Sequence, residues 1–583
     1  MKNNQILKRI ALVSVSALTL TFACKDQFLE VPPTASLAQA QLSSKEGVEG
    51  TLIGAYAQLA AKGYSRLAAG NNWVWGSIRG GENNKGTDAG DFTAINPMQR
   101  YEVQPTDGDL NSTWQAKYEG IARCNATINL ANGSKEISAA DKTRIIGEAR
   151  FLRGHYYFEL KKLFNSVPYV DETLDYGKGI EKVANTEAFW DKIEADFAFA
   201  FANLPATSSS AGRANKWAAA AYLGKVQMFR KKYADAKTTL TAVITSGKTP
   251  LGVKYALLPK FGDVFDPAKK NGSEHVFSVQ MTVNDGTGAA NANAGDALNF
   301  PYGGETGCCG FFQPSFTLAN IYKVTADGLP MLGDEFFTNP LKNDQGISSD
   351  KAYSPDVTTP LDPRIDWTIG RRGVPYLDWG IMPGSNWVRD QGTAGPYEPL
   401  KHLFRKAQVG ILTDGSSWTN GFTANNYPLI RFADVLLLAA EAEVETGGLE
   451  KAREYVNLVR TRASNPAGFV GPSNNAGLVS GTNYQIKTYT AAWTDAAVAR
   501  KAVRFERRLE LAMEGHRFSD LTRWGQGVTE LNTYAVQEAA LGYGQIKGST
   551  YKAGKSEYLP LPQTQIDKSV KDGKSVLTQN PGY

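Results

Sequence analysis

The clearest alternation of apolar and polar positions lies near the C-terminal end, where residues 503–525 read VRFERRLELAMEGHRFSDLTRWG. Its apolar residues recur at three- to four-residue steps, the spacing of one face of a packed helix: Phe505, Leu509, Ala512 and Met513. Gly515 then breaks the period, and we predict a second short helix near Phe518–Trp524.

The other faces of this segment carry a dense set of arginine, glutamate and aromatic side chains. Arg507 lies one turn before Glu510, and Glu514 lies one turn before Arg517, so opposite charges can meet along the segment. A solvated amphipathic helix is the plainer interpretation. The density of charge and rings favours a partly buried polar network instead.

Helical periodicity recurs along much of the chain after about residue 46. We predict amphipathic helices around residues 51–59, 114–128, 145–164 and 190–204, the third of them ended before Pro168. Residues 25–45 contain Pro32-Pro33 and are predicted to be an extended tether.

Two segments show the residue spacing of tetratricopeptide repeats, in which small residues let two antiparallel helices approach closely. The first copy contains Leu223, Gly224, Tyr233, Ala236 and Leu240, and the second contains Ala439, Ala440, Gly447, Leu449, Ala452 and Val456. About two hundred residues separate the copies, which favours a helical scaffold split by a long insertion over a simple solenoid. Two unrelated helical hairpins are the alternative.

The insertion runs from about residue 250 to 426 and is rich in glycine, proline, asparagine and aromatic residues. It has little periodicity, apart from a short strand predicted at His275–Met281. So long an irregular region in a compact domain is usually functional. We therefore predict a mainly α fold, with tetratricopeptide-like helix pairs supporting a loop-rich insertion that has a few short strands. We divide the chain into an N-terminal helical region (46–249), the loop-rich insertion (250–426) and a C-terminal helical region (427–583).

The N-terminus has the pattern of an export signal. Lys2, Lys8 and Arg9 precede an apolar core over residues 10–23, which is too short to span a membrane. Cys24 follows Ala23 directly, as in a bacterial lipobox, although Thr21 stands where such boxes usually have leucine. We predict that residues 1–23 are removed, that Cys24 is lipidated, and that residues 24–45 form the tether. A secreted protein cleaved elsewhere is the alternative.

Composition excludes several other classes of protein. The 583 residues are 42% hydrophobic and 21% charged, which excludes wholesale disorder. Without the three basic residues of the leader, 60 basic groups face 58 acidic ones, so charge gives no argument for nucleic acid. Cys124, Cys308 and Cys309 are too few for a disulfide scaffold.

No catalytic or metal-binding motif stands out. The four histidines are His155, His275, His402 and His516, and none is paired at metal-ligand spacing. The sequence has no GxSxG elbow and no Walker loop. The 58 acidic residues leave a glycosidase pair neither placed nor excluded. We expect no enzyme activity and no cofactor.

A binding site has more support, because two segments combine flat aromatic rings with polar side chains. Rings can cover the CH-rich face of a sugar while polar groups bond its hydroxyls. The candidates are Trp73, Trp75, Trp367, Tyr376, Trp379, Trp387, Arg389 and Asp390. For any single tryptophan, packing of the insertion onto the helices is the alternative.

Cys308 and Cys309 are adjacent, and adjacent cysteines can join only through a strained eight-membered ring. Such a ring would stiffen a loop and present sulfur to a ligand. Two buried thiols are the alternative, and the sequence does not choose between them.

Four blocks of the chain closely resemble the SusD/RagB family, in family order. They are EARFLRGHYYFELKKLF (148–164), YPLIRFADVLLLAAEAEVE (427–445), ERRLELAMEGHRFSDLTRWG (506–525) and YLPLPQTQID with LTQNPGY at the end. The resemblance covers nearly the whole chain.

The resemblance implies an outer-membrane lipoprotein that faces the cell exterior and binds a nutrient, mostly a glycan. It would deliver that nutrient to a SusC-like TonB-dependent transporter without changing it covalently. A receptor for peptide or another non-glycan nutrient is one alternative, and a glycoside hydrolase is another. The segment DPRIDWTIGRRGVPYLDWG (362–380) also resembles a family block, so its aromatic residues can be scaffold.

Overall fold

The computed structural model describes residues 42–471 and 482–583. The predicted leader 1–23, Cys24 and nearly all of the predicted tether lie outside the described residues. Within those two ranges, no helix combines the length and the apolar character that crossing a membrane requires.

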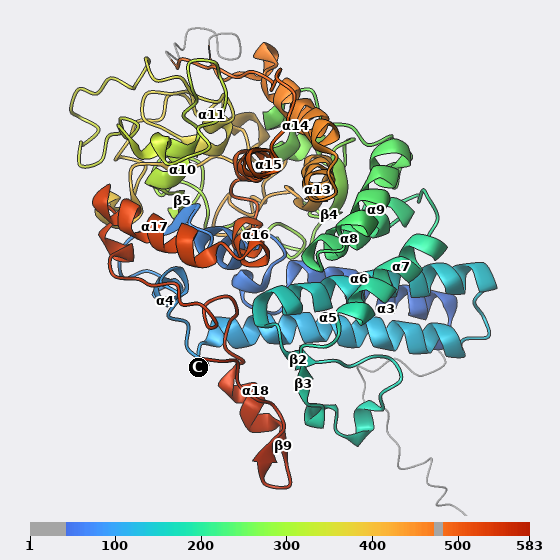
Figure 1. Cartoon of the computed structure of the whole chain (residues 1–583). Helices are drawn as coiled ribbons and strands as arrows, with labels where there is room; N and C mark the ends of the chain where they lie inside the picture. Colours follow the sequence, from blue (N-terminus) through green and yellow to red (C-terminus); the bar gives the residue numbers. More distant parts are fainter. Residues whose placement is uncertain (1–41, 472–481) are drawn as a thin grey trace, which may run out of the picture.

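Long helices near the N-terminus lie side by side along one side of the molecule (Figure 1). They are α3 (Lys45–Ala57), α5 (Gly108–Gly133), α6 (Ala139–Phe164) and α7 (Trp190–Asn203). The carboxylate of Asp107 caps α5 by accepting a hydrogen bond from the Leu110 amide at 2.8 Å, and the Ser138 hydroxyl caps α6. The predicted helical segments near 51–59, 114–128, 145–164 and 190–204 lie mostly or wholly in these helices.

The two predicted repeat copies form helix pairs that meet in space. The first pair is α8 (Lys216–Phe229) with α9 (Tyr233–Ser246), and the second is α13 (Phe432–Glu445) with α14 (Leu449–Ala463). Helix α9 packs on α13, and α15 (Ala496–Glu510) packs on both helices of the second pair. The mainly α fold with packed helix pairs is thereby confirmed.

Five two-stranded antiparallel sheets complete the regular structure of the described residues. Strand β4 (His275–Val279) pairs with β8 (Tyr427–Arg431), and β1 (Asn83–Gly86) pairs with β5 (Phe311–Pro314). The predicted strand at 275–281 is therefore confirmed, two residues shorter. The smaller sheets are β2 (Val167–Pro168) with β3 (Asn185–Thr186), β6 (Ile369–Gly370) with β7 (Glu398–Pro399), and β9 (Val570–Lys571) with β10 (Lys574–Ser575).

Residues 250–426 contain short elements separated by long loops. Besides strands, the helices there are α10 (Phe316–Ile321), α11 (Ile365–Thr368), α12 (Gln391–Ala394) and several 3-10 turns. The remaining α-helices in residues 42–471 and 482–583 are α4 (Ile95–Gln99), α16 (Arg517–Trp524), α17 (Gly527–Ala540) and α18 (Gln563–Lys568).

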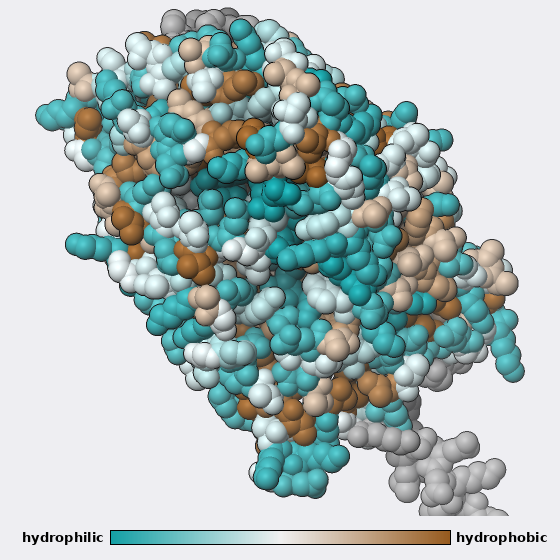
Figure 2. Space-filling view, viewed as in Figure 1, coloured by the Kyte–Doolittle hydropathy of each residue, from teal (hydrophilic) through white to brown (hydrophobic). Residues whose placement is uncertain are grey.

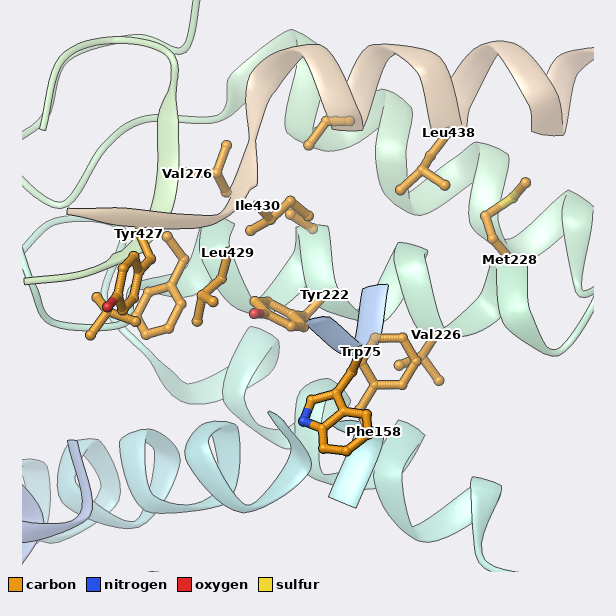
Figure 3. Close-up of a cluster of buried hydrophobic side chains, with 14 of the residues drawn as sticks. Trp75, Phe158, Tyr222, Val226, Met228, Val276, Tyr427, Leu429, Ile430 and Leu438 are labelled. Carbon is orange, nitrogen blue, oxygen red and sulfur yellow. The ribbon is translucent and has the colours of Figure 1, made fainter. Parts of the chain in front are cut away.

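A large hydrophobic core joins the N-terminal helices, the helix pairs and the sheet β4–β8. Figure 3 shows part of it, where side chains from distant segments meet: Trp75, Phe158, Tyr222, Ile430 and Leu438. Val276 of the insertion lies in the same cluster, so the insertion is anchored on helices that precede and follow it in the chain.

Helix α15 ends at Glu510, earlier than its apolar stripe predicts. The Met513 amide donates to the buried carboxylate of Glu82, and the Gly515 amide donates to the Ser77 hydroxyl. These long-range bonds replace the helical ones. A Cβ on Gly515 would lie 2.4 Å from the Asn71 carbonyl oxygen, so glycine is needed for this close approach.

The predicted buried polar network is confirmed, but its partners are distant in sequence. Arg364 donates to Glu506 at 2.7 Å and to Glu510 at 2.9 Å, and all three side chains are fully buried. The two predicted local pairs are wrong. Arg507 and Glu510 share α15 but bond different partners, and the chain has left that helix before Glu514. Arg507 instead pairs with Asp434 and Asp520, and Arg517 pairs with Glu530.

Candidate ligand-binding surface

Trp73 and Trp75 lie in a short π-helix, η4 (Trp73–Ile78), and are each 1% exposed. The Trp75 ring nitrogen donates to the Leu67 carbonyl at 2.8 Å. Trp73 packs edge-on against Phe312, with ring centroids 5.6 Å apart. Both rings fill the core, so we leave them out of the candidate surface.

Tyr376 is also fully buried, and its hydroxyl donates to the Pro399 carbonyl. Its ring lies edge-on to Trp387, with centroids 5.3 Å apart. Tyr376 therefore supports Trp387 from below instead of facing a ligand.

Trp367 and Trp379 are half-buried, and each ring nitrogen is already bonded within the chain. Trp367 donates to the Gly468 carbonyl at 2.6 Å and lines a cavity of about 190 Å³. Trp379 donates to the Phe404 carbonyl at 2.9 Å, and the Lys406 ammonium lies 5.7 Å from its ring centroid. Each keeps part of its ring at the surface.

Trp387 is half-buried beneath the loop that begins at Tyr302. The Gly303 amide donates to the Trp387 carbonyl at 3.0 Å. A Cβ on Gly304 would lie 2.7 Å from the Trp387 ring nitrogen, and Gly304 has a φ of +82°. Only glycine fits this contact without strain. The glycines therefore let the loop of Tyr302 lie directly on the Trp387 ring.

Arg389 is the centre of an ion-pair cluster. Its guanidinium bonds Asp91 at 2.6 Å and Asp88 at 2.7 Å, and donates to the Thr87 hydroxyl. The same guanidinium lies 4.8 Å from the ring centroid of Tyr302. Asp390 has a different role, since its carboxylate caps the short helix α12 through the Gly392 amide and the Thr393 hydroxyl.

Tyr302 was not among the residues predicted from the sequence, yet its side chain is 49% exposed over Arg389. Trp418 was also missed and is 60% exposed. A signal was present in both cases, because each ring adjoins a run of small or glycine residues, YGGETG at 302–307 and GSSW at 415–418. Such runs favour surface loops.

Cys308 and Cys309 are joined by a disulfide and are half-buried, which decides between the two alternatives left open by the sequence. The Cys309 amide donates to the Leu298 carbonyl at 2.8 Å. The preceding Gly307 lies against the 419–421 segment, so the disulfide sits between the loop of Tyr302 and the loop of Trp418. We call Tyr302, Trp387, Arg389 and the Cys308–Cys309 disulfide the candidate surface.

Two charged groups beside the candidate surface have lowered pKa values, with opposite effects on their charged forms. Burial alone would raise the pKa of Asp88, but the amides of Asp91 and Gly90 and the charge of Arg389 outweigh it and lower that pKa. Burial lowers the pKa of Lys85, whose ammonium donates to the Asp88 and Asp91 carbonyls at 2.7 Å each.

This arrangement suits binding: an exposed ring is backed by a fixed cation, with carboxylate oxygens beside it that can accept hydrogen bonds. Across the parts of the chain that the structure describes, no group of three histidine, cysteine, aspartate or glutamate side chains is placed to hold a metal ion.

Comparison with known proteins adds independent findings. The SusD family model matches residues 273–583, and a model described as starch-binding associating with outer membrane matches residues 27–228. SusD-like protein P25 of Formosa agariphila is 24% identical over 543 residues, covering 88% of this chain and 89% of that protein. SusD-like protein P2 of the same organism is 23% identical and covers 99% of this chain and 100% of that protein.

Two solved structures are similar in fold. A laminarin-binding SusD-like protein has a TM-score of 0.64 at 22% identity, covering 93% of this chain and 100% of that one. A SusD superfamily protein from Bacteroides vulgatus has a TM-score of 0.67 at 20% identity, covering 92% and 99%. The SusD family model matches residues 273–583, which is more than half of this chain, so the chain belongs to the SusD family.

Proposed function

We propose that the protein is an outer-membrane lipoprotein that binds an oligosaccharide at the candidate surface. It would deliver this ligand to a SusC-like TonB-dependent transporter. The family makes the chain a binding protein and not an enzyme, so uptake energy would come from the transporter. A surface glycan-binding protein of similar fold from Bacteroides thetaiotaomicron forms a complex with laminarihexaose, which supports a glycan as the ligand. The match to a family associating with the outer membrane supports that location.

One observation carries the proposal: the exposed ring of Tyr302, with Arg389 fixed against it by Asp88 and Asp91. A ring fixed in advance costs little conformational entropy when a sugar stacks on it. The carboxylates of Asp88 and Asp91 are themselves partly exposed and can accept hydrogen bonds from sugar hydroxyls.

The neighbouring groups have supporting roles. Trp387 holds the loop of Tyr302 through the contacts of Gly303 and Gly304, and the Cys308–Cys309 disulfide limits the freedom of the same loop. Trp418 offers a second exposed ring beyond the disulfide. Most of these residues lie between 250 and 426, so we propose that this region is the ligand-binding insertion.

The test is calorimetric titration of the mature chain with a panel of neutral oligosaccharides that includes laminarihexaose. We expect saturable binding that Tyr302→Ala weakens about tenfold, since a ring contact contributes about 0.5–1.5 kcal/mol beyond the area it buries and about 1.4 kcal/mol is a tenfold change in affinity. Tyr176→Ala is the matched control, because Tyr176 is 40% exposed and lies beside α5, where its hydroxyl accepts a hydrogen bond from Asn125. We expect that control to bind normally.

Three outcomes would count against the proposal. Equal binding by both tyrosine variants would remove the candidate surface from the site. New reducing ends in the titrated samples would contradict a purely binding role. Binding to peptides and to no member of the sugar panel would favour a receptor for a non-glycan nutrient.

A further inference from the structure

A second concave site lies on another part of the molecule, among α15, α16, α17 and the 332–337 segment. Its volume is about 490 Å³, within the range of pockets that hold small ligands. Figure 2 shows mainly hydrophilic residues around the hollowed middle of the face that carries these helices.

The lining of this cavity is strongly cationic. The lining contains two acidic side chains, Asp334 and Glu530, and five basic ones. The basic side chains are Arg500, Lys501, Arg504, Arg508 and Arg517. Two of the five are already paired, Arg500 with Glu445 and Arg517 with Glu530. The other three have no ion pair within the described residues.

Arg508 is the least compensated of these cations. Among the residues that the structure describes, its guanidinium has neither a hydrogen-bond partner nor an ion pair, and its Nε is buried. The Nε atoms of Arg504 and Arg517 are also buried without a partner in that part of the chain. Burial and the nearby charge of Arg517 lower the pKa of Arg508 to about 10, so it remains charged at neutral pH.

Arg504 and Arg508 are half-buried, and a guanidinium nitrogen that is shielded from water without a partner is costly. A bidentate oxyanion is the ligand that suits such groups. The rest of the lining suits a sugar ring that carries such a group. Phe337 and Phe505 supply apolar surface for its CH face, and Gln526, Thr529 and Thr533 supply groups that bond hydroxyls.

We propose that this cavity, here named the arginine pocket, binds the carboxylate or sulfate group of an acidic saccharide, with Arg504 and Arg508 as its main ligands. The proposal rests on the proposed function only in taking the ligand to be a saccharide. It adds a second binding site with its own charge preference, separate from the candidate surface.

The test compares charged oligosaccharides with their neutral counterparts on the full mature chain. One arm uses tri-galacturonic acid and the same trisaccharide after reduction of its carboxyl groups. The other arm uses a sulfated oligosaccharide and its desulfated form. We expect the charged form to bind at least about tenfold more tightly in one arm, and that arm identifies the anionic group.

Arg508→Gln and Arg504→Gln should each weaken binding of the charged form about tenfold or more, because each removes a charge-assisted hydrogen bond. Lys571→Gln is the matched control, since it removes one positive charge from the exposed strand β9 and should change nothing. Lys501 is exposed and lines the pocket, so Lys501→Gln should fold normally and tests the pocket even if an arginine variant unfolds.

Equal affinity for charged and neutral forms in both arms would overturn the proposal. So would normal binding by Arg504→Gln and Lys501→Gln, or binding of inorganic sulfate without any charged saccharide. If a neutral glycan binds through Tyr302 and the arginine variants change nothing, the arginine pocket is contradicted and the proposed function is not. Binding of charged saccharide that depends on Arg504 but not on Tyr302 would leave the arginine pocket standing without the candidate surface.

Discussion

At the scale of single residues, the buried carboxylate of Glu514 shows how the charged signature holds the fold. It bonds the Arg431 guanidinium at 2.7 Å and the Lys401 ammonium at 2.8 Å, and all three side chains are buried. Burial alone would raise the pKa of Glu514, but Arg431 and Lys401 outweigh it and lower that pKa to about 2. The ionised form is therefore favoured by folding.

We predict that Glu514→Gln lowers the free energy of unfolding by about 3 kcal/mol at pH 7, because it leaves two buried cations short of a partner. A lowered pKa gives stability that is present above the unfolded value near 4.5 and lost as pH falls through about 2. The difference between wild type and Glu514→Gln should therefore shrink over that window. Urea unfolding at several pH values measures it.

Glu454→Gln is the control for this prediction. Glu454 pairs with Lys451 on the exposed face of α14, and exposed pairs contribute little. Its substitution should change stability by less than about 0.5 kcal/mol at pH 7. A Glu514→Gln deficit that stays constant from pH 7 to pH 2 would show that the carboxylate's charge is not what stabilises the fold.

At the scale of elements, close packing of α8 on α9 requires that residue 224 be glycine, which has no side chain. A Cβ on Gly224 would lie 2.6 Å from the Cγ of Leu240, well inside contact distance. Gly224→Ala should therefore destabilise the fold by about 1–3 kcal/mol through overpacking, although alanine favours a helix by about 1 kcal/mol. The midpoint of thermal unfolding gives the sign and size of this effect.

Gly50→Ala provides the matched control in α3, where an added Cβ would meet nothing within 4 Å. The same substitution should there stabilise the protein by about 0.5–1 kcal/mol. If both variants shift unfolding in the same direction, helix propensity and not close packing decides the effect at Gly224.

Periodicity predicted most of these elements because a helix that packs on a core must repeat its apolar residues. It predicted α6, α7 and the strand at His275 for that reason. Periodicity did not predict the end of α15. The amides of Met513 and Gly515 donate there to Glu82 and Ser77, which lie more than four hundred residues earlier in the chain. The partners of Arg507 were also not predicted, because Asp434 and Asp520 lie on other helices.

At the scale of the whole molecule, the candidate surface joins segments that no local pattern connects. Arg389 was predicted, but its partners Asp88 and Asp91 come from an N-terminal loop that folds beside β1 and β5. Aromatic composition could not separate buried Trp75 from exposed Trp418, because both adjoin polar and glycine residues. Exposure depends on the packing of the complete chain.

The attachment of the molecule to a membrane gives the last prediction. Cys24 follows the apolar leader core directly, and acyl chains on that residue would contribute about 0.8 kcal/mol per buried CH₂ group. Cys24→Ala should therefore move the protein from the detergent-rich phase to the aqueous phase in a partition assay, and remove the acyl mass from its N-terminal peptide. Cys124→Ala is the matched control, because Cys124 is buried in α5 and should not affect partitioning. Retention of Cys24→Ala in the detergent phase would contradict the predicted anchor, unless the apolar leader stays uncleaved. Mass measurement of the N-terminus would then decide between that outcome and the predicted anchor.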